Sequence, residues 1–364
     1  MIKEYQFESV NRLEIDITSY CNASCGACGR NKNGGKRYTN IPLQHFKNWD
    51  KLITKENLEY IEEIIFDGNF GDFQMHPGFI DLINDLAKVK TNLRLVLHTN
   101  GGARNPTFWK QLAHSLKPFA EASIDFGIDG NKETNHIYRR GVNWESLMRN
   151  VKAFNDAGGV SIWKTIVFEY NKDQLNEIQE LAREIGCYGF ITNRNHTSRP
   201  ITLDKYRTYP SGNIESPPLK EYNKKYKISA DFKPWPFPLI KIGMGPGADV
   251  SYPKASYNPV TKNNQRDPKD SQCPYGERGM IHVDHMGDVW PCCWFGDWRS
   301  PLNNFDLRMQ IPEVWKGQNN IAKHSLKEIC TMFRPKLGEA WNTGSLQVCN
   351  DCNGKKHGLA PIYS

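Results

Sequence analysis

The chain lacks the features that mark several common protein classes. No apolar run approaches the length of a membrane-spanning helix, and residues 1–8 hold no apolar signal-peptide core. No GxGxxG turn follows the first predicted strand, which argues against a dinucleotide-binding fold. No internal repeat or heptad pattern occurs. We therefore expect a cytoplasmic protein that does not enter a membrane.

The composition excludes few further classes of protein. The 364 residues can hold two domains, and the net charge of +7 permits anionic partners without requiring them. The chain has ten cysteines. In a reducing compartment cysteines are kept mainly for metal binding, so their spacing is the next thing to read.

Three cysteines lie close together near the start, at Cys21, Cys25 and Cys28. They directly follow the alternating, β-branched segment Leu13–Ile17, which predicts a strand. A CxxxCxxC triplet supplies three thiolates where a four-iron cube needs four ligands, so one iron stays open for a small molecule. Structural zinc is the alternative, but no histidine lies between Cys28 and His45 to complete such a site.

The first half of the chain alternates predicted strands with predicted helices. The strands are expected at 12–18, 61–67, 93–99, 121–129, 161–169 and 188–192, and the helices at 43–53, 77–89, 106–116, 144–157 and 173–185. Successive β/α units of this kind favour an α/β fold with a parallel sheet covered by helices. We predict a partial (β/α)6 TIM-like barrel over residues 1–195, with its active site at the carboxyl ends of the strands.

The cysteine spacing in this context resembles that of radical S-adenosylmethionine (SAM) enzymes. In that family the open iron binds SAM, and the reduced [4Fe-4S] cluster cleaves it to a 5′-deoxyadenosyl radical. Ala27 stands where the family usually has a larger, often aromatic residue. The resemblance implies SAM contacts in the turns that follow the strands.

These implied contacts come from five places in the chain. They are Gly68, Asn69, Phe70, Gly71 and Asp72 after the second strand, Thr99 and Asn100 after the third, Ser123 and Asp125 in the fourth, Arg139 and Arg140 beyond it, and Glu169 and Asn171 after the fifth. Asp72 would balance the SAM ammonium, and an arginine would hold the SAM carboxylate. Glu169 and Asn171 equally suit a polar strand end, and His98 suits a structural role better than that of a catalytic base.

Residues 196–272 differ from what precedes them. The stretch 201–272 holds ten of the 21 prolines, and 12 lysine and arginine residues against 7 aspartate and glutamate residues. We interpret the segment either as a basic linker that wraps the enzyme or as a solvated insertion.

A second cysteine cluster defines the third predicted domain, residues 273–364. Its cysteines are Cys273, Cys292, Cys349 and Cys352, and a β-hairpin is expected at 281–290, around a turn at Gly287. The arrangement resembles the SPASM auxiliary-cluster extension in its shorter, Twitch-type form, which implies one auxiliary [4Fe-4S] cluster in a small β-hairpin/helix iron–sulfur domain. Structural zinc is again the alternative. Cys293 is a candidate hydrogen-atom donor or simply a buried thiol.

Together these residues predict a radical SAM enzyme with two [4Fe-4S] clusters that abstracts a hydrogen atom from a substrate C–H bond. The substrate we expect first is a ribosomally made peptide or protein. The alternative is dehydrogenation or epimerisation of a small polar metabolite such as a carbohydrate or an aminoglycoside-like molecule. A flavodoxin- or ferredoxin-type protein would donate the electron. A nucleic-acid-binding zinc protein is a distant third interpretation.

Overall fold

The protein is built around an eight-stranded sheet. A computed structural model describes residues 6–26, 28, 31–32, 36–37, 43–168, 170–194, 279–293 and 317–332. The strands follow the order β10-β9-β1-β4-β5-β6-β7-β8. They are β1 (Arg12–Ile15), β4 (Glu63–Phe66), β5 (Arg94–Thr99), β6 (Glu121–Gly127), β7 (Ser161–Val167), β8 (Gly189–Arg194), β9 (Met280–Val283) and β10 (Val289–Trp290). From β1 to β8 all neighbours in the sheet are parallel.

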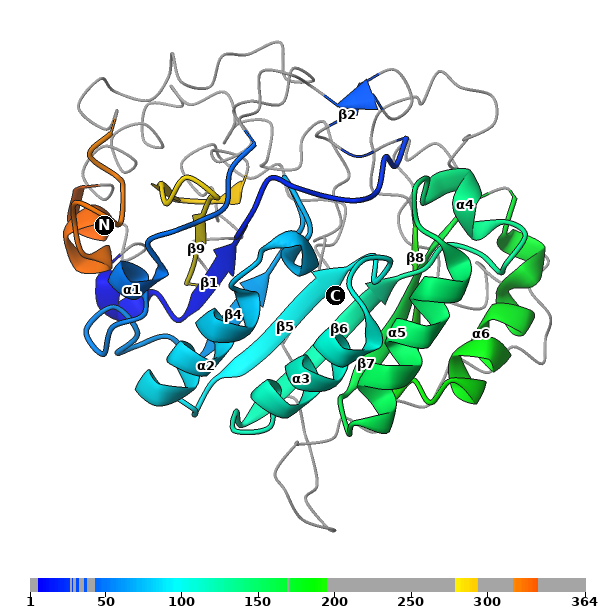
Figure 1. Ribbon diagram of the computed structural model, residues 1–364. Coiled ribbons are helices and arrows are strands. Elements are labelled where there is room, and N and C mark those ends of the chain that lie inside the picture. The colour runs from blue at the N-terminus through cyan, green and yellow to red at the C-terminus, as the bar shows by residue number, and fades with distance from the viewer. Residues whose placement is uncertain are drawn as a thin grey trace, which may run out of the picture.

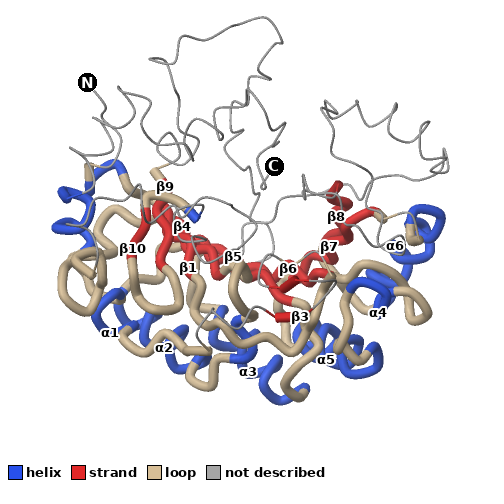
Figure 2. The backbone as a smooth tube through the Cα atoms, turned by 90° about the horizontal axis from the view of Figure 1, so that it is seen from above, coloured by secondary structure: helices blue, strands red, loops and turns tan. Residues whose placement is uncertain are grey.

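Helices cover one face of this sheet (Figure 1). The longer ones are α2 (Phe79–Val89), α3 (Pro106–Leu116), α5 (Trp144–Asp156) and α6 (Leu175–Glu184). Seen from above, the sheet curves and these helices lie on its outer side (Figure 2). Among the described residues the sheet is open, with β10 and β8 at its two edges. The predicted partial barrel is confirmed.

Short elements fill the connections. They are η1 (Phe7–Ser9), β2 (Asn31–Lys32), β3 (Lys36–Arg37), α1 (Trp49–Leu52), η2 (Phe73–Met75), α4 (Asn135–Tyr138) and η3 (Lys172–Gln174). Strands β2 and β3 pair with each other as a separate antiparallel ribbon.

The long helices begin where the sequence supplies capping residues. The Asn105 side chain accepts a hydrogen bond from the backbone N–H of Phe108, and Pro106 occupies the first turn of α3. The Asn143 side chain accepts from the N–H of Ser146 in the same way at the start of α5. Each helix buries a stripe of residues spaced three or four apart, which packs on the sheet.

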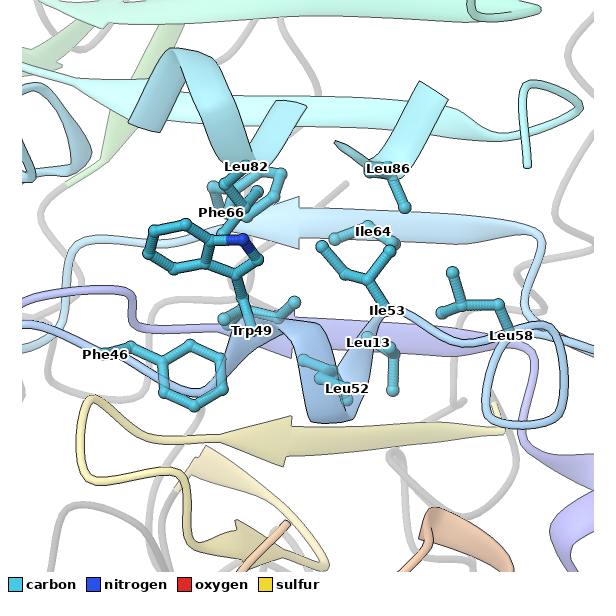
Figure 3. Close-up of a pocket in the computed structure, with 11 residues that line it drawn as sticks. Leu13, Phe46, Trp49, Leu52, Ile53, Leu58, Ile64, Phe66, Leu82 and Leu86 are labelled. Carbon is cyan, nitrogen blue, oxygen red and sulfur yellow. The ribbon is translucent and has the colours of Figure 1, made fainter. Parts of the chain in front are cut away.

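The core lies between the helices and the outer face of the sheet. A small apolar cavity lies within it, where side chains of β1 and β4 meet α1, α2 and the loop after α1 (Figure 3). Its lining includes Leu13, Ile64, Phe66, Leu82 and Leu86. Because alternate strand residues point to opposite faces, the side chains between these in sequence face the inner, concave side.

One predicted helix is mostly absent. The sequence predicted a helix over residues 43–53, but only α1 is helical. Residues 44–46 instead run beside the segment that follows β1. The backbone N–H of Ser19 donates to the carbonyl of Gln44 (2.9 Å), and the N–H of Phe46 donates to the carbonyl of Ile17 (2.8 Å). These long-range bonds use the groups that a helix would need, so tertiary pairing overrides the local pattern.

The predicted hairpin of the third region is present, and it extends the main sheet. β9 and β10 pair antiparallel, and β9 runs parallel to β1 with His282 opposite Glu14. A helical segment that starts at residue 326 joins the same body, since the N–H of Leu326 donates to the Asn57 side chain (2.9 Å). The residues 196–272 lie outside the described part, and the three domain boundaries stay predictions.

No helix in the described part of the chain is both long and apolar enough to cross a lipid bilayer.

Candidate active site

The cysteine loop follows β1 and is held by three other parts of the chain. The N–H of Ser19 is paired with Gln44, as described above. The N–H of Asp72, in the loop after β4, donates to the carbonyl of Tyr20 (2.8 Å). The N–H of Ser24 donates to the carbonyl of Arg140, beyond α4 (2.8 Å). The loop is therefore fixed at the carboxyl ends of the strands, where the sequence predicted the site.

The surroundings of the Cys21 sulfur suit a thiolate, and the backbone around Cys25 is held by further bonds. The Cys21 sulfur accepts from the backbone N–H of Ala23 (3.3 Å) and from the Asn100 amide (3.6 Å). Cys25 is buried, and its carbonyl accepts from the N–H of Cys28 (3.3 Å) and from the Asn31 amide (3.0 Å). Donors aimed at sulfur favour its ionised form, which is the form that binds metal. Within the described residues, no group of three or more His, Cys, Asp or Glu side chains is arranged to hold a single metal ion.

Asp72 ties the loop after β4 to the end of β5. One carboxylate oxygen accepts from the Thr99 hydroxyl (2.8 Å), and the other accepts from the backbone and side-chain N–H groups of Asn100 (2.8 and 2.6 Å). Burial raises the pKa of Asp72, and the bonds from Asn100 and Thr99 partly offset this. Asn100 in turn forms a reciprocal amide pair with Asn22 in the cysteine loop. Three residues predicted as SAM contacts thus form one network beside Cys21.

The glycine at position 71 permits a close backbone approach. A Cβ atom there would lie 2.2 Å from the carbonyl oxygen of Thr18 and 2.6 Å from that of Tyr20. The resemblance implied Gly71 as a SAM contact. In the structure, Gly71 lets the turn approach the cysteine loop.

The neighbouring residues of this turn face inward. The Asn69 side chain donates to Glu14 (3.1 Å), and its backbone N–H donates to Asp16 (2.9 Å). Phe70 is buried, with its ring 5.1 Å from that of His285. The turn therefore also joins β1 to the region of the β9–β10 hairpin.

A second network joins the ends of β6 and β7. Asp129 is fully buried and forms an ion pair with the Arg139 guanidinium (2.6 Å). Asn171, also fully buried, donates to the carbonyls of Asp129 (2.8 Å) and Ile166 (2.9 Å). Burial lowers the pKa of Arg139, but Asp129 and Cys25 outweigh it, so the pKa of Arg139 is raised. The Arg139 guanidinium also lies against Gly127, where a Cβ would meet it at 2.5 Å.

Tyr170 is a residue that the sequence reasoning missed. Its ring stacks on Phe168 (5.2 Å between centroids), and its hydroxyl is buried without a hydrogen-bond partner in the described residues. Burial first, and then the charge of Asp129, raise the pKa of Tyr170, and Cys25 contributes in the same direction. A buried, unpaired hydroxyl near the cysteine loop fits a polar group bound there.

The concave face carries charged side chains just below this edge. His98 lies between two carboxylates, with Nδ1 3.1 Å from Asp67 and Nε2 3.4 Å from Asp125. Lys164 Nζ lies 3.2 Å from the same oxygen of Asp125. Burial lowers the pKa of His98, but hydrogen bonds to Asp125 and Asp67 outweigh it and raise the pKa to about 9. Ser123, one residue pair below Asp125 on β6, is half-buried on the same face.

The structure describes only some of the remaining predicted site residues. Cys292 is buried and Cys293 is half-buried, both directly after β10. The backbone carbonyl of Arg140 holds Ser24, as described above. Glu169, Cys273, Cys349 and Cys352 lie outside the described residues. Lys164 was not singled out from the sequence; a lysine between Trp163 and Thr165 on a largely buried strand is a signal that could have indicated the concave face.

Residues 15–185 match the sequence model of the radical SAM superfamily. The chain contains a radical SAM domain. The matched span runs from the last residue of β1 through the cysteine loop and the strands to β7, and these elements build the site described above. No curated protein matches the chain.

Solved structures share the fold. SuiB of Streptococcus suis bound to the precursor peptide SuiA has a TM-score of 0.53 at 14% identity, over 91% of this chain and 66% of SuiB. Native anSMEcpe with bound AdoMet and the Cp18Cys peptide has a TM-score of 0.52 at 16% identity, over 93% of this chain and 82% of that chain. The chain thus spans slightly less than two thirds of the length of SuiB. At these identities the similarity shows a common fold.

The Gly71 contact predicts a strong effect of one methyl group. Gly71→Ala should push the Thr18 carbonyl aside, lower the free energy of unfolding by about 2–3 kcal/mol and make Cys25 react faster with a thiol reagent. Gly158→Ala is the control: its φ of +85° strains an alanine, but the new Cβ would meet only Lys117, at 3.9 Å. That variant should lose about 1 kcal/mol and leave Cys25 unchanged. Equal labelling rates in the two variants would show that Gly71 does not set the loop.

The charged state of His98 predicts a pH dependence of stability. A pKa raised from 6.5 to about 9 stabilises the fold fully below pH 6.5, and the stabilisation is lost as the pH rises through 9. Over that window wild type should lose roughly 3 kcal/mol relative to His98→Gln, at about 1.4 kcal/mol per pKa unit. Anaerobic urea unfolding at several pH values measures this, with His114→Gln, an exposed site on α3, as control. Parallel profiles for wild type and His98→Gln would contradict a charged His98.

Proposed function

We propose that the protein is a radical SAM enzyme that removes a hydrogen atom from a substrate C–H bond. The observation that carries the proposal is the cysteine loop: three thiols, fixed at the carboxyl ends of the strands, with two N–H donors on the Cys21 sulfur. Cys21, Cys25 and Cys28 would hold a [4Fe-4S] cluster. When bound, the cluster and SAM would supply a 5′-deoxyadenosyl radical.

The donors around the loop fit such a group. N–H bonds to cysteine sulfur are one of the means by which proteins stabilise iron–sulfur clusters. The Tyr170 hydroxyl, which has no hydrogen-bond partner among the described residues, and the Arg139 guanidinium, which is paired with Asp129, form a polar border near Cys25. An anionic group such as the SAM carboxylate suits this border, and Arg139 or Arg140 stays the proposed partner.

The other SAM contacts are proposed as the sequence implies them. They are Gly68, Asn69, Phe70, Gly71, Asp72, Thr99, Asn100, Ser123, Asp125, Glu169 and Asn171. Where Asp72, Thr99 and Asn171 are bonded within the protein, their proposed role is to hold the backbone that contacts SAM.

An auxiliary [4Fe-4S] cluster of the Twitch type is the second part of the proposal. Its ligands would be Cys273, Cys292, Cys349 and Cys352. Support comes from the β9–β10 hairpin, which ends two residues before Cys292 and lies beside β1, the strand that leads into the cysteine loop. Cys293, the next residue, is the proposed hydrogen-atom donor only if the reaction is an epimerisation.

We propose a peptide or protein as the substrate. SuiB was solved with a precursor peptide and anSMEcpe with the Cp18Cys peptide, and both share this fold. A small polar metabolite is the alternative. A flavodoxin- or ferredoxin-type donor, and a cytoplasmic setting for its reducing chemistry, belong to the same proposal.

Removal of one thiol tests the SAM-binding cluster. Anaerobically reconstituted Cys25→Ala should bind less iron and form no 5′-deoxyadenosine from SAM and dithionite, because the cluster loses a ligand. Cys187→Ala is the control, since that thiol is buried and burial raises its pKa to about 11, as for a packing residue. It should retain both iron and cleavage. A zinc-containing, colourless wild-type protein would refute the proposal.

Iron content tests the auxiliary cluster separately. Reconstituted wild type should hold roughly eight irons per chain, the sum of two four-iron clusters. Cys352→Ala should hold roughly half of that and still cleave SAM, because the first cluster is intact. Wild-type iron near four, with normal SAM cleavage, would leave the first cluster standing and remove the second.

A further inference from the structure

His282, on β9, is buried between two carboxyl groups of β1. Its Nδ1 lies 3.7 Å from Glu14 Oε1, and its Nε2 lies 3.4 Å from Asp16 Oδ2. All three side chains are at most 1% exposed. Both ring nitrogens, Glu14 Oε2 and Asp16 Oδ2 have no hydrogen-bond partner among the described residues. Buried polar atoms are nearly always hydrogen-bonded, so four of them in one place call for an explanation.

The spacing of these groups suits neither a metal ion nor a bridging water. In the described part of the chain, they do not form a set of three ligands arranged around one metal position. A water that bridges two groups keeps them roughly 4.5–5.5 Å apart, because each hydrogen bond is about 2.8 Å long. The two contacts of His282 are shorter than that, and they exceed a direct hydrogen bond by only about 0.5–0.8 Å. A proton shared between the imidazole and a carboxyl group would close them.

The pKa values of the three groups favour such sharing at neutral pH. Burial raises the pKa of Glu14 and of Asp16, and burial lowers the pKa of His282 to about 4. The charge of Asp67 raises the pKa of all three groups, and that of Asp284 adds to the effect on Asp16. The carboxyl groups thus hold protons as donors, and the neutral imidazole is an acceptor. Transfer of a proton from a carboxyl group to His282 leaves the net charge of the cluster unchanged.

This cluster is connected to the partly exposed concave face of the sheet. Glu14 shares a hydrogen bond with Asp67, and Asp67 Oδ1 lies 3.1 Å from His98 Nδ1. On the other side of the ring, His98 Nε2 lies 3.4 Å from Asp125 Oδ2. The side chains of Asp67, His98 and Asp125 are 12%, 16% and 13% exposed, so the contacts run from a fully buried imidazole to groups that solvent reaches. We give the name ionisable series to His282, Asp16, Glu14, Asp67 and His98.

The register of the sheet places the members of the ionisable series next to one another. His282 is paired with Glu14 across β9 and β1, and His98 is paired with Asp125 across β5 and β6. Asp67 follows directly after β4, which lies between β1 and β5. Apolar side chains ordinarily fill a barrel interior and would avoid the cost of burying ionisable groups. Side chains that backbone pairing holds in such a series therefore suit a role other than packing, and a proton can pass along them without movement of the strands.

We propose that the ionisable series is a proton relay between the partly exposed His98 and the buried His282. The Nδ1–H bond of His98 breaks as a carboxyl O–H bond forms on Asp67. Asp67 then gives a proton to Glu14, and Glu14 gives its own proton to His282 Nδ1. Asp16 accepts a hydrogen bond from Nε2 of the charged His282 ring. His98 is reprotonated from the solvent-exposed side, no electron moves in any step, and the same steps run in reverse.

A relay that ends at His282 serves the hairpin that leads to the second cysteine cluster. Strand β10 follows β9 and ends two residues before Cys292. In the proposed function, the charge near Cys292 and Cys293 changes when an electron arrives there or when the Cys293 thiol gives up a hydrogen atom. The relay lets a compensating proton reach the buried hairpin while the sheet stays closed. This use rests on the proposed function, whereas the relay itself does not.

Hydrogen exchange at the His282 ring tests the relay. In the reconstituted full-length protein, labelled with ¹⁵N in histidine and aspartate, exchange of the His282 ring N–H with water is measured by NMR and assigned with His282→Gln. The backbone N–H of Asp16 donates to the carbonyl of Val283 (2.9 Å), so its exchange reports separation of β1 from β9. Urea below the unfolding transition should speed exchange of this amide and change the ring rate less than twofold. A parallel rise of both rates would show exchange by opening of the sheet and overturn the proposal.

Variants along the series locate the path. Asp67→Asn and His98→Gln each remove a proton carrier and keep His282 itself, so each should slow the ring exchange at least tenfold, with the Asp16 amide correcting for altered opening. His114→Gln, at an exposed site on α3, should leave the rate unchanged. If one of the first two variants fails to fold, the other decides. Wild-type ring exchange in these variants, or equal slowing in His114→Gln, would refute the relay. SAM cleavage by wild type is assayed independently, so failure here is separable from failure of the proposed enzyme class.

Discussion

The site depends on the contact between two backbones at Gly71. There the loop after β4 lies so close to the cysteine loop that a single methyl group would overlap the carbonyls of Thr18 and Tyr20. The next residue, Asp72, then uses both oxygens to hold Thr99 and Asn100 at the end of β5. Three strand ends are thereby fixed to one another before any ligand binds. Preorganisation of this kind is what a metal-binding loop needs, because three thiols must stay in place when the metal is absent.

Much of the fold follows from local pattern. Strands and helices between β1 and β8 were predicted close to their observed bounds because their apolar spacing and caps act over a few residues, as with Asn105 and Pro106 at α3. The expected helix at 43–53 failed because its backbone groups pair with the segment after β1 instead, a contact between residues 25 or more apart. The position of β9 beside β1 joins residues more than 260 apart, and nothing in the hairpin sequence indicates its neighbour.

For the site, as for the fold, the sequence predicted the positions of the residues but not their contacts. Motif and position pointed to the cysteine loop and to the turns after the strands, and these do meet at one edge. The sequence did not reveal what each side chain does there. Asp72 looked like a partner for a bound ammonium, yet its carboxylate is buried in bonds to its own chain. Whether the Tyr170 hydroxyl finds a partner among the described residues depends on what surrounds it in space, and a single tyrosine after a strand carries no such signal.

Charge balance connects the edge of the sheet with its interior. At the edge, the Arg139 guanidinium is paired with the buried Asp129, and the pKa of Arg139 is raised first by Asp129 and then by Cys25. Below it, His98 lies between Asp67 and Asp125, Lys164 is paired with Asp125, and burial raises the pKa of Glu14 and Asp16 near the hairpin. Buried charges at both levels are therefore paired with opposite charges of the same chain, which offsets part of the cost of burying them.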